Sequence, residues 1–385
     1  MLEEARKRTV ILQERMRDQG IRKAVFTDES SIAYLAGFWG YLGIEFGRPT
    51  MLIVDAEEAP IVITPLMESE MVAEMTWVER VETWEDIGQR SWGRALARAL
   101  GDSPSEIWIE RGSIPAIIRN HLDDTHPGVP LKDISQVLGP MRMIKTPFEI
   151  NVMKQAGEIA GAMMAAAHDS LREGALEYES ALAVIDAGSR KAASFLSDRG
   201  WERFVSPMIH NLQIMQSGKD ASMVHRRSSV KAYEKFDPVY FCFCNMAQFK
   251  QYKLGFDRMF HIGDVTDEAR RAQEAAIEAQ QAAISVMRPG ILAEDVAAAA
   301  NDVYQRHGYK TGYRTGRSIG VAYLEAPELK TGDTTVLQAG MTFAVDGGIS
   351  VDGVTAGRIG DSVVVTKTGT DYVTNYPREI LLSRT

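Results

Sequence analysis

Two stretches of the sequence, SLREGALEYESALA at residues 170–183 and SVMRPGILAEDVAAAA at residues 285–300, share one pattern although they lie far apart. In both, an alanine-rich helical segment ends near an arginine and a glycine, and a second helical segment begins a few residues later. The matched positions are Arg172 with Arg288, Gly174 with Gly290, Leu176 with Leu292, and Glu179 with Asp295. We interpret the repeat as an internal duplication of one half built from helices and strands. Two alanine-rich helices that end in glycine can also look alike by chance.

A clear helix start precedes the first copy. Thr146 is a candidate N-cap, Pro147 stands at the first helical position, and Glu149 completes a capping box. Apolar residues then recur at helical spacing as far as Leu171. After the second copy, apolar runs separated by glycines are typical of strands. We therefore expect a curved antiparallel sheet covered by helices over residues 141–385.

The N-terminal part of the chain has a different pattern. Helical periodicity at the start is followed by apolar runs that read as strands, such as TMLIVD at 50–55 and EIWIE at 106–110. The pair Gly139-Pro140 marks a boundary. We therefore predict an α+β protein with a small α/β domain over residues 1–140 and a second domain over residues 141–385.

The composition excludes several classes of protein. Of 385 residues, 45% are hydrophobic and 25% charged, and the net charge is -9. No block of Lys and Arg suggests a nucleic-acid partner, and no apolar run approaches the roughly 20 residues of a membrane span. The start of the chain lacks the apolar core of a signal peptide. Cys242 and Cys244 are the only cysteines, so we expect a cytoplasmic protein without a disulfide framework.

Six local patterns that follow one another in the second domain resemble the creatinase, methionine aminopeptidase and prolidase superfamily (M24-like). The resemblance implies the pseudo-two-fold pita-bread fold and a hydrolase. The patterns are RMIKTPFEI at 142–150, SGKDASMVH at 217–225, LGFDRMFHIG at 254–263, TGRSIGVAYLEAP at 315–327, GMTFAVDGGI at 340–349 and AGRIGDSVVVT at 356–366.

The metallopeptidases of this superfamily hold two metal ions with two Asp, one His and two Glu. Their positions fall here on Cys244, Gly255, Arg317, Asp346 and Gly360. Carboxylates and imidazoles suit such a site, whereas a guanidinium repels a cation. The resemblance therefore implies a branch without these ligands, and we expect no metal and no other cofactor.

Creatinase shares the fold and works without a metal. The resemblance makes His225 the counterpart of its general base, and places Asp257 and Asp346 where creatinase has glutamates. These three residues are the catalytic candidates. One imidazole can deprotonate a water molecule and then protonate the leaving nitrogen, while carboxylates hold a cationic group.

Further candidates concern substrate binding. In EFGRPTMLIV, Phe46 and Arg48 match creatinase residues that reach into the partner subunit's site, which implies a homodimer with shared sites. Arg317 is expected to hold an anionic group or an aspartate. Arg258 is expected to contact substrate, or to form a structural ion pair with its neighbour Asp257.

The leading hypothesis is hydrolysis of a C–N bond in a small guanidino or amidine metabolite that carries a carboxylate. Alternatives are ring opening like that of ectoine hydrolase, a metal-dependent Xaa-Pro peptidase or dimethylsulfoniopropionate lyase of the same fold, and a non-catalytic binding protein. Cys242 and Cys244 lie on one face of a strand by their spacing. We interpret them as buried core residues rather than as a thiolate pair.

Overall fold

The computed structural model describes residues 1–40, 42–85, 91–101, 104–198, 202–209, 214–244, 246–312 and 314–384. The chain forms two compact units, residues 1–141 and residues 142–385. This division lies one residue from the boundary expected from the sequence. The α+β class, with a small α/β unit followed by a larger antiparallel unit, is confirmed.

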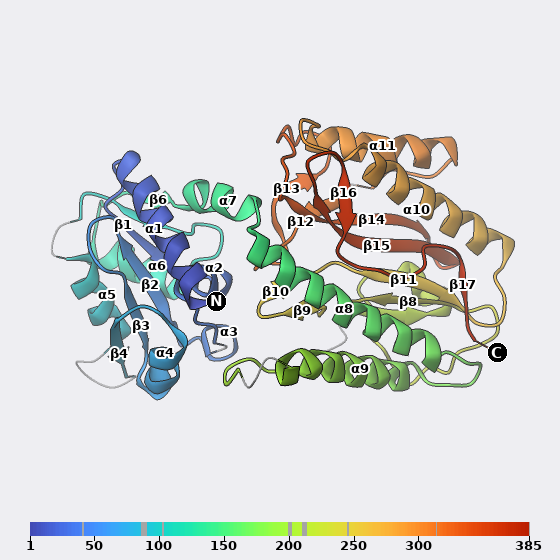
Figure 1. The fold of residues 1–385 in the computed structure, drawn as a ribbon, viewed down its shortest axis with the longest axis horizontal. Coiled ribbons are helices and arrows are strands. Elements are labelled where there is room, and N and C mark those ends of the chain that lie inside the picture. Colours follow the sequence, from blue (N-terminus) through green and yellow to red (C-terminus); the bar gives the residue numbers. More distant parts are fainter. Residues whose placement is uncertain are drawn as a thin grey trace. The chain divides into compact units, whose positions relative to one another are not determined.

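The N-terminal unit contains a mixed sheet with the strand order β4-β3-β2-β1-β5-β6 (Figure 1). β1 and β3 each pair antiparallel with β2, and the other neighbours are parallel. Every residue of β2 and β3 is buried, because helices cover both faces of the sheet. The strands are β1 Lys23–Phe26, β2 Met51–Asp55, β3 Ile61–Pro65, β4 Arg80–Trp84, β5 Ile107–Ile109 and β6 Leu131–Asp133. The helices are α1 Leu2–Asp18, α2 Glu29–Ala36, α3 Leu42–Phe46, η1 Leu66–Glu68, α4 Ser69–Met75, α5 Trp92–Leu100, α6 Ala116–Thr125 and α7 Ser135–Met143.

The C-terminal unit is built on a large antiparallel sheet with the strand order β13-β12-β14-β15-β11-β8-β7 (Figure 1). β16 adds to β15, and β17 pairs parallel with β11. β9 and β10 form a separate short hairpin. The strands are β7 Ile214–Ser217, β8 Pro238–Cys242, β9 Gln248–Phe249, β10 Tyr252–Lys253, β11 Asp257–His261, β12 Gly316–Ser318, β13 Glu325–Leu329, β14 Thr342–Val351, β15 Thr355–Val365, β16 Thr370–Tyr372 and β17 Leu381–Leu382.

Two helix pairs cover this sheet and follow the duplication seen in the sequence. They are α8 Pro147–Ser170 with α9 Glu177–Asp198, and α10 Asp267–Val286 with α11 Ala293–Arg306. Gly174 and Gly290 both have positive φ angles, +82° and +93°, between the two helices of their pair. Leu176 and Leu292 each form an isolated bridge to a segment further along the chain. The predicted capping box of Thr146 and Glu149 is also confirmed. The matched positions therefore have the same structural role in each half.

Glycines let α10 lie directly on the strands that carry the candidate site. A Cβ added to Gly347 of β14 would lie 2.0 Å from the carbonyl oxygen of Ala276, and one on Gly357 of β15 would lie 2.2 Å from that of Ala272. Any larger residue would push the helix away, so the two glycines fix the positions of β14 and β15 beneath α10.

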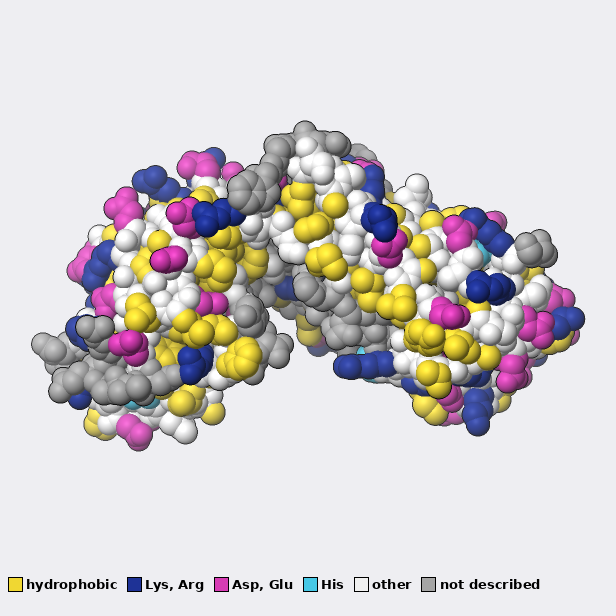
Figure 2. All heavy atoms as spheres, turned by 90° about the horizontal axis from the view of Figure 1, so that it is seen from below, with side chains coloured by type: hydrophobic (Ala, Val, Ile, Leu, Met, Phe, Trp, Pro, Cys, Tyr) yellow, Lys and Arg dark blue, Asp and Glu magenta, His cyan; other side chains and the backbone are white. Residues whose placement is uncertain are grey.

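The surface carries charges of both signs. Figure 2 shows Lys and Arg side chains intermixed with Asp and Glu on the face that it displays, without a continuous basic area. None of the helices in the described ranges combines the length and the hydropathy that a membrane span requires.

Candidate active site

A cavity of about 390 Å³ in the C-terminal unit brings four of the predicted site residues together. His225, Asp257, Arg317 and Asp346 all line it. They come from the loop after β7 and from β11, β12 and β14. The sequence resemblance also placed Cys244 in the site, at a metal-ligand position of the family. It assigned no role to the other polar residues of the wall, which are Tyr240, Cys242, Arg314, Tyr323 and Arg358.

The two aspartates face each other across a glycine. Asp257 of β11 and Asp346 of β14 are both in register with Gly360 of β15, the strand between them. A Cβ on Gly360 would lie 2.1 Å from Asp257 Oδ2 and 2.9 Å from Asp346 Oδ1. The missing side chain therefore leaves the space in which the carboxyl groups meet. Burial, and then the negative charge of Asp346, raise the pKa of Asp257 well above its ordinary value.

Arg317 occupies the centre of the site. Its Nη1 donates to Asp346 Oδ2 at 2.7 Å and its Nη2 to Cys244 Sγ at 3.4 Å. Its guanidinium carbon lies 4.2 Å from the centroid of the Tyr323 ring. Burial disfavours the charged guanidinium, but Asp346 and the nearby thiols outweigh this and raise the pKa of Arg317. Gly255 adds room, because a Cβ there would lie 3.1 Å from Nη2.

The two cysteines line the cavity. Cys242 also belongs to a small buried core cluster and Cys244 packs against it, so their predicted place in the core is confirmed. Cys242 Sγ donates to Cys244 Sγ at 2.7 Å. That hydrogen bond, together with the positive charge of Arg317, lowers the pKa of Cys244 against the effect of burial. Burial raises the pKa of Cys242 well above its ordinary value. The spacing in the sequence gave their common face but not which face lines the cavity.

His225 is exposed and lies on the loop that follows β7 and the short helix η3, Gly218–Ser222. The next residue, Arg226, anchors this loop through ion pairs of 2.9 Å with Glu177 and with Asp220. The backbone of Arg226 also accepts a hydrogen bond from Met215 of β7. These contacts hold the imidazole on the cavity wall.

Arg358 is a cavity residue that the sequence interpretation missed, although it stands in the quoted AGRIGDSVVVT pattern. It is in register with Gly348 of β14, and a Cβ there would lie 2.7 Å from Arg358 Nη1. The side chain thus crosses β14 where no side chain blocks it. Nη2 donates to Ser350 Oγ at 2.5 Å, and Nε is buried without a hydrogen-bond partner. No carboxylate in the described ranges forms an ion pair with Arg358.

Arg258 does not line the cavity, and its predicted contact with substrate is wrong. Neighbouring residues of a strand point to opposite faces, so Arg258 lies behind the sheet when Asp257 faces the cavity. Its side chain is 1% exposed and pairs with Asp361 at 2.9 Å. It also donates to the carbonyl oxygens of Asp257, Gly360, Tyr376 and Pro377. Arg258 is therefore a structural residue, and its ion-pair partner is Asp361 rather than Asp257.

Phe46 and Arg48 lie in the N-terminal unit, at and just after the end of α3. Phe46 is exposed, and Arg48 Nη1 lies 3.5 Å from Met67 Sδ. Their predicted role in a partner's site stays a prediction.

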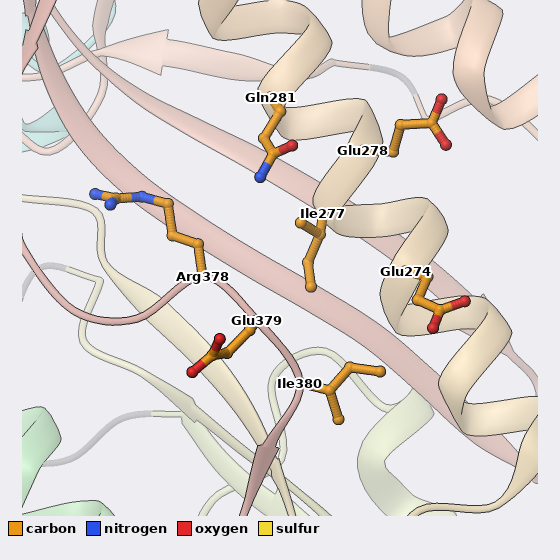
Figure 3. A pocket seen from close by; sticks show the side chains of 7 residues that line it. All are labelled: Glu274, Ile277, Glu278, Gln281, Arg378, Glu379 and Ile380. Carbon is orange, nitrogen blue, oxygen red and sulfur yellow. The ribbon is translucent and has the colours of Figure 1, made fainter.

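A second hollow of about 510 Å³ lies between α10 and the segment before β17 (Figure 3). Two of its charged groups, Arg378 and Glu278, have structural partners. Arg378 donates to Asp361, and Glu278 pairs with Arg306 and His307. This hollow offers no comparable set of facing acids and bases, so the first cavity is the candidate active site.

Comparisons with known proteins agree with this architecture. A family model described as Metallopeptidase family M24 matches residues 151–367. The chain belongs to this family. A second model, described as the Creatinase/Prolidase N-terminal domain, matches residues 8–144.

The relatives of this M24 protein carry different names. It is 27% identical to the agropine synthesis cyclase of Rhizobium rhizogenes over 365 residues. The alignment covers 89% of this chain and 88% of the relative. It is 29% identical over 370 residues to the probable dipeptidase PepE of Mycobacterium bovis. This alignment covers 95% of this chain and 93% of the relative. The crystal structure of dipeptidase PepE from Mycobacterium ulcerans superposes with a TM-score of 0.81 at 26% identity. The superposition covers 99% of this chain and 98% of that structure. Membership of the family therefore establishes the fold and the hydrolase class, but it does not identify the reaction.

The sequence resemblance assigns the metal-ligand positions of the peptidases to Cys244, Gly255, Arg317, Asp346 and Gly360, and these side chains do not suit a metal pair. In the structure Cys244, Gly255 and Asp346 lie next to the Arg317 guanidinium, and Gly360 lies next to the Asp346 carboxyl group. Two of these residues offer no side-chain ligand, and a third is a cation that already uses Asp346 and Cys244. Hard divalent ions require oxygen and nitrogen donors instead.

The raised pKa of Asp257 can be tested through the pH dependence of the free energy of unfolding. Its folded state keeps a proton that the unfolded state loses at lower pH, so stability falls as pH rises between the ordinary and the raised value. We expect Asp257→Asn to remove this fall, so the variant gains stability over the wild type as pH rises above the ordinary aspartate pKa of about 4. Urea denaturation across this range measures the difference.

Asp346→Asn is the matched control. It leaves the buried Arg317 without its charged partner, so it should lower the free energy of unfolding by about 3 kcal/mol. It should weaken the fall with pH without removing it, because burial still raises the pKa of Asp257 when the charge of Asp346 is gone. Equal pH dependence of the wild type and Asp257→Asn would contradict the assignment of the proton to Asp257.

Proposed function

We propose that this M24 protein hydrolyses a C–N bond in a small guanidino or amidine compound that carries a carboxylate, without the metal pair of the peptidases. The observation that carries the proposal is the position of Arg317, which donates to Asp346 at 2.7 Å. Both residues stand at positions that the sequence resemblance assigns to metal ligands of the peptidases. The cavity of about 390 Å³ has a size suited to a small molecule. Its wall offers carboxyl groups and guanidinium groups together, which suits a zwitterion.

In this proposal the aspartates hold the cationic end of the substrate. A guanidinium or amidinium carbon reacts slowly because its charge is delocalised, so hydrolysis needs an activated water molecule. His225 takes a proton from water as the oxygen adds to this carbon. The C–N bond then breaks as the imidazolium returns the proton to the leaving nitrogen. Asp257 and Asp346 stabilise the charge that remains on the amidine nitrogens.

Arg358 is our candidate for the substrate carboxylate within the same chain. It lines the cavity, and its buried Nε has no hydrogen-bond partner, which favours a ligand that accepts from it. Phe46 and Arg48 keep the role expected from the sequence, as contributions from the partner subunit of a homodimer.

The test combines metal analysis with a panel of substrates. The purified protein is treated with EDTA, its metal content is measured, and it is incubated with creatine, guanidinoacetate, ectoine and an Xaa-Pro dipeptide. We expect turnover of a carboxylate-bearing guanidino or amidine compound by protein without stoichiometric metal. Cleavage of the dipeptide alone, restored by a divalent ion, would overturn the proposal in favour of a peptidase. Ligand-induced thermal stabilisation with no product from any compound would indicate a binding protein.

His225→Ala tests the base. The variant should lose at least about 100-fold in kcat with the hydrolysed compound, while KM stays within about threefold, because general acid–base catalysis contributes that much. His307→Ala is the control, since His307 lies at the end of α11 and pairs with Glu278. A variant at residue 225 that keeps wild-type kcat would remove His225 from the mechanism.

Arg358→Gln tests recognition of the carboxylate. Loss of a charge-assisted hydrogen bond should raise KM about tenfold or more, with a smaller effect on kcat. The uncharged carboxamide analogue of the same substrate is the control, and wild type and variant should use it equally well. A KM that rises equally for both compounds would show that Arg358 acts through the structure of the cavity instead.

A further inference from the structure

Cys242 and Cys244 form a thiol pair on the cavity wall that the proposed reaction does not use. They are the only cysteines of the full sequence. Their sulfur atoms lie 2.7 Å apart, and both residues line the cavity. Since Cys242 ends β8 and Phe243 is tied by its backbone N–H to the carbonyl of Phe256, the turn between the cysteines is held in place.

The environments of the two thiols differ in a way that assigns an order of reaction. Cys242 is 3% exposed and is in register with Asp257 of β11, a carboxyl group that disfavours a thiolate. Cys244 is only half-buried, and the guanidinium of Arg317 donates to its sulfur at 3.4 Å. A nearby guanidinium stabilises a thiolate, and the thiolate is the reactive form of cysteine.

We propose that Cys242 and Cys244 are a reversible thiol–disulfide site that exchanges with small disulfides entering the cavity. Cys244 is the attacking thiol and Cys242 is the resolving thiol. The inference concerns the cysteines alone, and it stands whether or not the proposed hydrolysis is correct.

The steps balance with a small disulfide as the oxidant. The Cys244 thiolate attacks one sulfur of the disulfide, forms a mixed disulfide and releases one thiolate. Cys242 then loses its proton and attacks Cys244 Sγ, which forms the bond between the two cysteines and releases the second thiolate. The protein loses two electrons and two protons, and the small disulfide becomes two thiols.

Oxidation would change the site chemically. The sulfur that accepts from Arg317 becomes part of a neutral disulfide, so the guanidinium keeps Asp346 as its only anionic partner among the described residues. The wall next to Asp257 and Asp346 is then both less polar and more rigid. The redox state of the pair is thereby linked to the charge balance of the cavity.

A soft metal ion is the competing occupant of the same atoms. Ligand atoms of Cys242, Cys244 and Asp257 all lie within 4.8 Å of one another. The guanidinium beside Cys244 Sγ opposes a cation at this point, so the geometry favours free thiols.

The experiment uses the full chain and the neutral probe 2-hydroxyethyl disulfide. Reduced, desalted protein is incubated with the probe, quenched with acid and measured by intact mass spectrometry. Wild type should lose two hydrogens and keep no hydroxyethylthio group, and dithiothreitol should reverse the change. Cys242→Ala should keep one such group on Cys244, and Cys244→Ala should react more than about tenfold more slowly.

Each single-cysteine variant is the control for the other. In urea both should react at similar rates, which shows that their difference comes from the folded cavity and not from the reagent. If one alanine variant fails to fold, the corresponding serine variant replaces it. The proposal fails if native wild type keeps a hydroxyethylthio group without losing two hydrogens, or if Cys244→Ala reacts as fast as Cys242→Ala. Stoichiometric zinc in the purified protein that blocks the reaction would also overturn it, in favour of a metal site.

Discussion

The buried guanidinium of Arg317 is the interaction on which the rest of the site depends. A buried cation is costly unless it has a charged partner and further donors or acceptors around it. Here Asp346, the sulfur of Cys244 and the face of Tyr323 supply them. Gly255 provides the space that the guanidinium needs. The guanidinium thus fixes the positions of the Asp346 carboxylate and the Cys244 thiol on the cavity wall.

The site lies where the two halves of the duplicated unit join. β11 belongs to the first half and β15 to the second, and they pair at Asp257 with Gly360 and at Arg258 with Ile359. The cavity face of this seam carries the two carboxyl groups. Its other face carries the buried pair of Arg258 and Asp361, so an internal ion pair holds the strands that position the acids.

Much of this arrangement was predictable, because it follows from local chain chemistry. The repeated helix pair and the capping box of Thr146 predicted the architecture of the second unit, and the ordered patterns predicted the family. His225, Asp257, Asp346 and Arg317 were expected at one site, and the structure brings them to one cavity.

The errors have physical reasons. Adjacent residues of a strand point to opposite faces of the sheet. Once Asp257 is assigned to the cavity, Arg258 must therefore lie on the other face and cannot contact the substrate. The place of Arg358 in the cavity depends on the register between β14 and β15, which no local pattern reveals. Arg358 enters the cavity only because Gly348, on another strand, leaves room for it. The role expected of Phe46 and Arg48 requires a second subunit, and it stays a prediction.

Proton binding and cation binding are coupled at this site. Asp257 holds its proton more tightly than an ordinary carboxyl group because it is buried next to Asp346. In the proposed function a cationic group next to Asp257 would favour its ionised form, so between the ordinary and the raised pKa its binding would release a proton. Releasing this proton costs free energy below the raised pKa, so the affinity for the cation would rise with pH over this interval. A neutral ligand of the same shape would displace no proton, and its affinity would not gain from the rise in pH.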